Sequence, residues 1–302
     1  MWFWLSIIAL LCWSGSDLFS KIGCRDASDR YSHLKMVMAV GVVMGLHAAF
    51  EIFMGGTEIS LSILLTYLPV SLLYIGSMTL GYLGLRYIEL SISSPICNSS
   101  GALVAVLTLI FVGAEDYSPL ALLAVALVCV GAVGLGVVDA CEDEDLRAQR
   151  QEAGNYKYAK SFLALALPVA YCILDAAGTF ADNRVLETLN EDSANVAYEL
   201  TFLLAGILSF VYVVLIKKDR LIPRMEDPKY TGAVFETAGQ FAYIYAIADT
   251  EHLAMSAPII SAYCAASVLW SRLFLKEKLS WKHYAMILLV VTGIVIMGVL
   301  DL

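Results

Sequence analysis

The chain has 302 residues, of which 60% are hydrophobic and 16% are charged. Soluble domains of this size are about 45–50% apolar and about 25% charged, so the composition excludes an ordinary soluble protein. The net charge of −9 lies mainly in short runs, such as residues 142–145 and the stretch from Asp182 to Asp192, which we interpret as solvated loop surface. A nucleic-acid partner is disfavoured, because it would require clustered surplus lysine and arginine.

Ten apolar stretches have the length that a helix needs to cross a bilayer, which is roughly 20 residues. Backbone polar groups in hydrocarbon must be satisfied within the segment, so these stretches are predicted to be helices and not strands. They are Trp2–Ser20, Met36–Met54, Ile63–Leu85, Ser93–Val112, Leu120–Val138, Phe162–Phe180, Ala194–Ile216, Thr231–Ala248, Leu253–Leu275 and Tyr284–Leu300. The first stretch has no basic residue before it and no cleavage site after it, so we read it as a retained helix. The sequence therefore predicts an all-α integral membrane protein with ten transmembrane helices.

An internal repeat divides the chain into two halves. A shift of 163 residues aligns Tyr67 with Tyr230, Tyr82 with Tyr245 and Pro95 with Pro258, and a shift of 162 aligns Glu115 with Glu277, Ser118 with Ser280 and Gly131 with Gly293. A shift of 158 aligns Trp13 with Tyr171 and Asp17 with Asp175. Each half holds five helices, an odd number, so the halves must cross the membrane in opposite senses, as in many secondary transporters. The predicted divisions are a first repeat at residues 1–138, a linker at 139–160 and a second repeat at 161–302.

Basic residues predict the orientation in the membrane. Of the 19 lysines and arginines, 18 lie in or beside the odd-numbered loops, and Arg184 is the exception. Loops that carry such an excess face the cytoplasm. The charge distribution therefore predicts a multi-pass protein of the cytoplasmic membrane with both termini outside.

A resemblance to a known family rests on a few motifs. The first stretch carries Trp13-Ser14-Gly15 and Lys21, and a proline stands at the entry to the fourth and ninth stretches. The most specific part is Pro258 followed by the run LFLKEKLS at residues 273–280, then Gly293 and Gly298. These features resemble the drug/metabolite transporter superfamily, and specifically two tandem EamA-like domains. The resemblance implies a five-plus-five helix fold, transport activity and cytoplasmic termini, the last in conflict with the charge distribution.

Two aspartates are the first candidate site residues. A charged group inside a membrane helix costs about 2.5–3.5 kcal/mol on insertion scales, which makes it a functional candidate. Asp17 has Trp13 one turn before it, whereas Lys21 one turn after it offers a neutralising partner as the structural alternative. Asp175 has Tyr171 one turn before it and no basic residue within reach along its own helix.

Polar side chains on three other predicted helices extend the candidate site. Glu236 and Gln240 are spaced i, i+4 in the eighth stretch, and Asn98 and Tyr263 lie in the fourth and ninth. Hydrogen bonding between helices is the alternative role for each of them. The predicted substrate-binding residues are Trp13, Asp17, Asn98, Tyr171, Asp175, Glu236, Gln240 and Tyr263.

The remaining polar residues were assigned structural roles. His47 and Glu51 form an i, i+4 pair, but Glu51 lies near a helix end where it could reach water, and Glu199 also lies near an end. All three stay outside the predicted site. The seven cysteines show no CxxC or metal-ligand spacing, so neither a metal nor a cofactor is expected.

A cavity with three carboxyl groups and several aromatic rings favours a cationic or amine-bearing solute through charge and cation–π attraction. The sequence thus predicts a secondary transporter that moves a small polar metabolite by alternating access. The same carboxyl groups could exchange protons, so protons are expected partners beside the substrate and membrane lipid. An intramembrane enzyme acting on a lipid or headgroup and a channel are the alternatives. The sequence contains no GxSxG, HExxH or P-loop motif, so we expect no enzyme.

Overall fold

The structure, a computed structural model, describes residues 1–26, 28–111, 113, 117–141 and 162–300. These residues are 86% helical and include no strand. Seven helical segments among them are apolar and long enough to cross a membrane. The prediction of an all-helical, multi-pass membrane protein is thus confirmed. The sixth, eighth and tenth predicted spans lie in helices outside that set of seven, so the number of ten spans stays a prediction.

The helices follow one another without any other secondary structure in the described residues. The first half comprises α1 (Trp2–Cys24), α2 (Ser32–Phe50) with its π-helical end η1 (Glu51–Gly55), α3 (Leu61–Tyr87), α4 (Leu90–Cys97), α5 (Ser100–Phe111) and α6 (Pro119–Ala140). The second half comprises α9 (Phe162–Leu186), α10 (Glu191–Phe210), η2 (Val211–Ile216), α11 (Pro223–Ile247), η3 (Thr250–His252), α12 (Leu253–Ser261), α13 (Tyr263–Trp270), η4 (Ser271–Leu275) and α14 (Trp281–Leu300). The predicted linker falls largely on residues 142–161, which lie outside the described residues.

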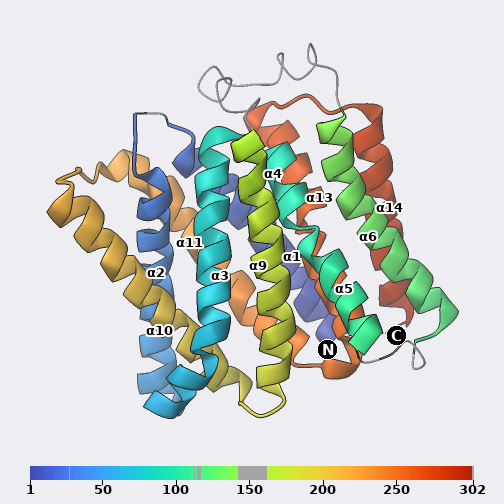
Figure 1. Ribbon diagram of the computed structural model, residues 1–302, viewed down its shortest axis with the longest axis horizontal. Helices are drawn as coiled ribbons and strands as arrows, with labels where there is room; N and C mark the ends of the chain where they lie inside the picture. The colour runs from blue at the N-terminus through green and yellow to red at the C-terminus, as the bar shows by residue number, and fades with distance from the viewer. Residues whose placement is uncertain (27, 112, 114–116, 142–161, 301–302) are drawn as a thin grey trace.

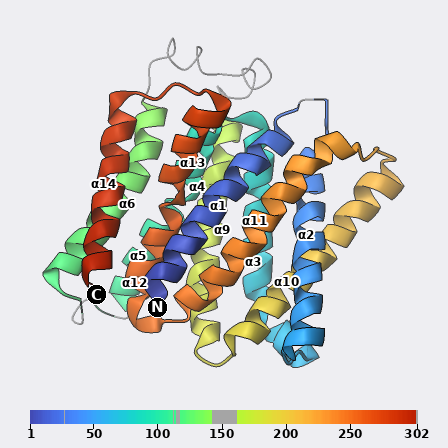
Figure 2. The same ribbon diagram turned by 180° about the vertical axis from the view of Figure 1, so that it is seen from behind.

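Helices of the first half pack mainly against helices of the second half. Helices α2 and α10 form one edge of the bundle, and α6 and α14 form the other (Figures 1 and 2). Between these edges α1 packs on α11, and α3 packs on α9. Under the predicted repeat α1 corresponds to α9 and α3 corresponds to α11. The repeat therefore maps the α1–α11 contact onto the α9–α3 contact, and the reverse. Both chain ends lie at the same end of the bundle (Figure 1).

Buried apolar side chains form two clusters on either side of the molecule. One lies mainly among α2, α3, α10 and α11, and the other among α6, α12, α13 and α14. Trp13 of α1 packs against both clusters. Helices α1, α3, α9 and α11 lie between the two edges of the bundle, and α1 thus contacts both apolar clusters.

The fourth and ninth predicted helices are interrupted, although the sequence predicted continuous spans. The breaks occur at Asn98, with ψ of 0°, and at Ala262, also with ψ of 0°. Pro95 and Pro258 lie about one turn before these breaks, and a proline inside a helix removes one backbone hydrogen bond and crowds the preceding turn. The two prolines aligned by the repeat thus stand at equivalent points of the fold.

Helix α9 extends further than predicted. The sequence placed its end at Phe180, but the helix runs to Leu186 because no glycine or proline interrupts residues 180–186. Asp182 lies on this extension and is 0% exposed. The interpretation of Asp182 as solvated loop surface is therefore wrong.

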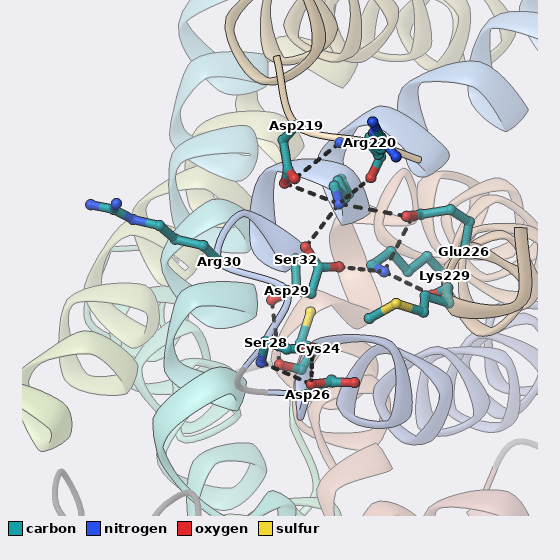
Figure 3. Close-up of polar contacts among 12 residues, drawn as sticks. Cys24, Asp26, Ser28, Asp29, Arg30, Ser32, Asp219, Arg220, Glu226 and Lys229 are labelled. Carbon is teal, nitrogen blue, oxygen red and sulfur yellow. Dashed lines mark hydrogen bonds and ion pairs between the residues drawn. The ribbon is translucent and has the colours of Figure 1, made fainter. Parts of the chain in front are cut away.

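A cluster of charged side chains joins the loop between α1 and α2 to the start of α11 (Figure 3). Lys35 Nζ lies 2.9 Å from Asp29 Oδ1 and 3.2 Å from Asp219 Oδ2. Lys229 Nζ lies 3.1 Å from Asp29 Oδ2 and 3.2 Å from Glu226 Oε2. The side chains of Asp29 and Lys229 are at most 1% exposed, so Asp29 is a buried anion shared between two lysines. We call these five residues the loop ion cluster.

Neighbouring contacts hold the same loop in place. Arg86 at the end of α3 donates to the Asp29 carbonyl at 2.6 Å and to the Arg30 carbonyl. Ser28 donates through its hydroxyl and its backbone N–H to Asp26, which lowers the pKa of that exposed carboxyl. Helices α1, α2, α3 and α11 are thus fastened together at one end.

Lys229→Met should destabilise the protein, because it leaves buried Asp29 and Glu226 with one cation fewer. Removing one partner of a buried pair typically costs about 3–5 kcal/mol. We expect a clear fall in Tm of the detergent-solubilised protein, measured by thermal unfolding. Arg224→Met, at an exposed position of the same helix, is the control and should leave the Tm unchanged. Equal Tm values for the two variants would contradict a stabilising role for the loop ion cluster.

Candidate functional site

A central cavity, with about 900 Å³ of empty space within and at its opening, lies between the two halves. Helices α1, α3, α9, α10, α11 and the interrupted helices all contribute to its walls. The eight residues predicted from the sequence all line this cavity: Trp13, Asp17, Asn98, Tyr171, Asp175, Glu236, Gln240 and Tyr263. The structure thus brings together side chains from five segments, whereas substrate binding by them stays a prediction.

Two glycines let aromatic rings approach the opposite helix. An added Cβ at Gly239 of α11 would overlap the indole ring of Trp13, and one at Gly81 of α3 would lie 2.9 Å from the Tyr171 ring. Trp13 and Tyr171 are aligned by the shift of 158 residues, and the same shift aligns Gly81 with Gly239. The same close contact therefore occurs once at each crossing, α1 on α11 and α9 on α3.

Asp17 is held by hydroxyl groups of the two interrupted helices. Its Oδ2 accepts from Ser94 Oγ of α4 at 2.5 Å and from Ser267 Oγ of α13 at 2.8 Å. Lys21 Nζ donates to the carbonyls of Leu85 at 3.0 Å and Ile88 at 2.9 Å. The structural alternative, in which Lys21 neutralises Asp17, is thus not the arrangement that the described contacts show.

The other two acids come from α9 and α11. Asp175 Oδ2 accepts from Ser100 Oγ of α5 at 2.7 Å. Trp13 Nε1 donates to the backbone carbonyl of Glu236 at 3.3 Å, and Ser16 lies beside the Glu236 carboxyl. No lysine or arginine occurs among the described residues that line the cavity. The cavity therefore holds three carboxyl groups among neutral partners.

Two buried polar groups in the wall remain without a hydrogen-bond partner among the described residues. They are the amide Nε2 of Gln240 and the hydroxyl of Tyr82. A buried donor without a partner typically lowers the stability of a protein by about 1–3 kcal/mol. A bound molecule that accepts a hydrogen bond from either group would recover that cost. Asn98 Nδ2 is occupied by the Ser94 carbonyl at 2.8 Å, and the Tyr263 ring packs edge-on against Trp13.

Several lining residues were missed at the level of sequence. Tyr74, Met78 and Tyr82 of α3 share one helix face, and Tyr82 had been noted only as a repeat marker. Tyr198 of α10 and Thr179 of α9 also line the cavity. The i, i+4, i+8 spacing on α3 was the available signal, but tyrosines at that spacing are also common in apolar cores.

The His47 group forms a separate site at the α2–α10 contact. His47 Nδ1 lies 2.9 Å from Glu199 Oε1, and its Nε2 lies 3.8 Å from Glu51 Oε1. Asn195 also donates to Glu199, which is 0% exposed. None of these residues lines the cavity.

Residues 164–299 match the model of the EamA-like transporter family. The match covers most of the second half of the chain. The predicted resemblance to the drug/metabolite transporter superfamily is thus confirmed, and the match supports a transmembrane transporter of that type. This EamA-like family consists of transporters, which disfavours the intramembrane enzyme considered from the sequence.

Solved structures share the fold, and 28 of their chains match. One of them, described only as "Crystal structure of protein", has a TM-score of 0.64 at 13% identity. The comparison covers 98% of this chain and 96% of that chain. At this identity the likeness shows the fold alone, but it extends over both halves. No protein of curated function matches the chain in sequence.

Gly239→Ala and Gly81→Ala should both destabilise the protein, because each added methyl meets an aromatic ring of the cavity wall. Overpacking of this kind typically costs about 1–3 kcal/mol. Thermal unfolding in detergent should show a lower Tm for both variants. Gly76→Ala is the matched control, since its Cβ would meet only Leu174 at 3.8 Å, an ordinary contact distance. A Tm for Gly239→Ala at or above that of Gly76→Ala would refute the close contact with Trp13.

Proposed function

We propose that this protein is a secondary transporter of a small, polar, amine-bearing or cationic metabolite, which it moves across the cytoplasmic membrane by alternating access. The observation that carries the proposal is the set of three carboxyl groups, Asp17, Asp175 and Glu236, in a cavity whose described lining has no lysine or arginine. A cation balances this charge, whereas a phosphate or dicarboxylate would add to it.

The surroundings of the acids also favour an amine. Rings of Trp13, Tyr171 and Tyr263 line the same cavity and offer their negative faces to a cation. An ammonium group can donate up to three hydrogen bonds, and the carboxyl oxygens of the three acids are the acceptors. The unpaired Gln240 amide, a donor, would suit a carbonyl or hydroxyl oxygen elsewhere on the substrate.

The transport cycle we propose uses two inverted five-helix repeats, residues 1–138 and 161–302. The exchanged contacts α1–α11 and α3–α9 and the aligned breaks in α4–α5 and α12–α13 support it. Interrupted helices near the midplane are a recurrent feature of transporter binding sites. One half would rock against the other around the central cavity, and bound protons would couple the movement to a gradient.

A thermal-shift screen tests the substrate class. Quaternary ammonium compounds, primary amines, amino acids, sugars and phosphates should be compared with purified protein. A true ligand stabilises by about 2.7 kcal/mol at one hundred times its Kd. We expect amines to raise the Tm, and stabilisation by phosphates alone would contradict the proposal.

Neutralising the acids tests the site. Asp17→Asn, Asp175→Asn and Glu236→Gln each remove a negative charge and keep the side-chain shape. At least one should reduce uptake of the stabilising amine into proteoliposomes by tenfold or more. Glu187→Gln, at an exposed position outside the cavity, is the control and should transport normally. Normal uptake by all three single variants would end the proposal.

The distribution of basic residues supports an orientation with both termini outside the cytoplasm. The α1–α2 loop and the loop before α11 lie at the opposite end of the bundle from both chain ends, and they carry many of the 18 grouped basic residues (Figure 2). We expect both termini outside the cytoplasm. A fusion at Leu302 should make a periplasm-dependent reporter active and a cytoplasm-dependent reporter inactive. The reverse result would favour the cytoplasmic termini that the family resemblance implies.

A further inference from the structure

Asp182 is a buried acid that lies outside the cavity wall. Its side chain belongs to α9 and is 0% exposed. Oδ1 accepts from the Tyr67 hydroxyl at 2.7 Å, and Oδ2 accepts from the Tyr74 hydroxyl at 3.3 Å. No ion pair to Asp182 occurs within the part of the chain that the structure describes. Two neutral hydroxyls are therefore its hydrogen-bond donors.

A short series of hydroxyl groups connects Asp182 with the cavity. The Tyr74 hydroxyl, besides its bond to Asp182, is hydrogen-bonded to the Tyr243 hydroxyl and lies 3.2 Å from Thr179 Oγ1. The Tyr243 hydroxyl donates to Thr179 Oγ1 at 3.1 Å. Tyr74, Thr179 and Tyr243 all line the cavity, whereas Asp182 does not. The acid thus lies one hydroxyl layer behind the cavity surface.

The described side chains in contact with Asp182 include no cation. Helix α3 contributes Tyr67 and Tyr74, α11 contributes Tyr243, and α10 contributes Tyr198. The next acid on the same face of α9 is Asp175 in the cavity, seven residues away and thus roughly 10 Å along the helix axis. The groups facing Asp182 are therefore phenols and one more distant carboxyl.

A permanent structural role does not require an acid at this position. An asparagine oxygen would accept a hydroxyl hydrogen bond without the cost of placing an ionisable group in the membrane. Acids in such positions mark proton pathways in pumps and transporters. Hydroxyl groups both donate and accept, so each can take one proton and release its own.

We propose that Asp182 binds the proton that this transporter exchanges for its substrate, and that the hydroxyls of Tyr74, Thr179 and Tyr243 carry the proton between Asp182 and the cavity. The proposal rests on the secondary transport proposed above. In one transfer, the carboxylic acid gives its proton to the Tyr74 oxygen, and each hydroxyl passes its own proton onward. The hydroxyls end unchanged, Asp182 ends as a carboxylate, and one proton reaches the cavity.

An infrared titration tests the proton site without any substrate. The carbonyl stretch of a protonated carboxylic acid is recorded over a range of pH for wild type, Asp182→Asn and Asp227→Asn. Asp227 is an exposed aspartate of α11 and provides the matched control. We expect a titrating band in wild type and Asp227→Asn that is missing from Asp182→Asn. The same band in all three proteins overturns the proposal.

A flux experiment tests the coupling. Proteoliposomes containing each variant receive labelled tetramethylammonium, a permanently charged cation, with and without a gradient of one pH unit. One-for-one exchange with protons gives about tenfold accumulation, because one pH unit is a tenfold ratio of proton activity. Asp182→Asn should still equilibrate the cation at equal pH but accumulate it no further with the gradient.

Tyr74→Phe tests proton transfer through the hydroxyl groups apart from proton binding by Asp182, because it removes one hydroxyl and keeps the acid. It should retain the infrared band and lose gradient-driven accumulation. Accumulation by Asp182→Asn equal to wild type, or wild-type uptake that ignores the gradient, overturns the coupling. If wild type moves no tetramethylammonium even at equal pH, the transport proposal fails for this cation, and the infrared result still decides whether Asp182 binds a proton.

Discussion

The close crossing of helices from opposite halves is the constraint on which the cavity depends. Glycine at positions 81 and 239 lets α3 and α11 approach the aromatic rings of α9 and α1 without a Cβ in the way. Trp13 and Tyr171 are thereby pressed into the wall of the cavity, one turn from Asp17 and Asp175. In a membrane, where water does not drive helices together, packing of this kind is the main source of helix association.

The interrupted helices complete the site that the crossings frame. Their breaks place serine hydroxyls next to the acids, with Ser94 and Ser267 on Asp17 and Ser100 on Asp175. Hydroxyl donors stabilise a carboxylate but add no charge of their own. The described contacts of Asp17 and Asp175 therefore pair these acids with hydroxyl groups and not with a lysine.

Charge is distributed unevenly along the bundle. At the end that holds the α1–α2 loop, buried Asp29 is shared between Lys35 and Lys229 (Figure 3). At the centre and beyond it, Asp182 and the acids of the cavity are bonded to hydroxyls. Paired charges resist separation, whereas an acid among hydroxyls can change its protonation with little rearrangement. The ion pairs of Asp29 suit a structural contact between helices. The acids bonded to hydroxyl groups suit a site that exchanges protons or cations.

The sequence by itself determined the helical membrane fold and eight residues of the cavity, because long apolar runs leave few alternatives in lipid and an acid within such a run is conspicuous. It did not reveal the breaks at Asn98 and Ala262, since a proline in a membrane helix can also be tolerated without interruption. It misjudged Asp182, because whether a polar helix end faces water or a neighbouring helix depends on what packs against it. Only the tertiary structure, which brings Tyr67 and Tyr74 of α3 against α9, decided that Asp182 is buried.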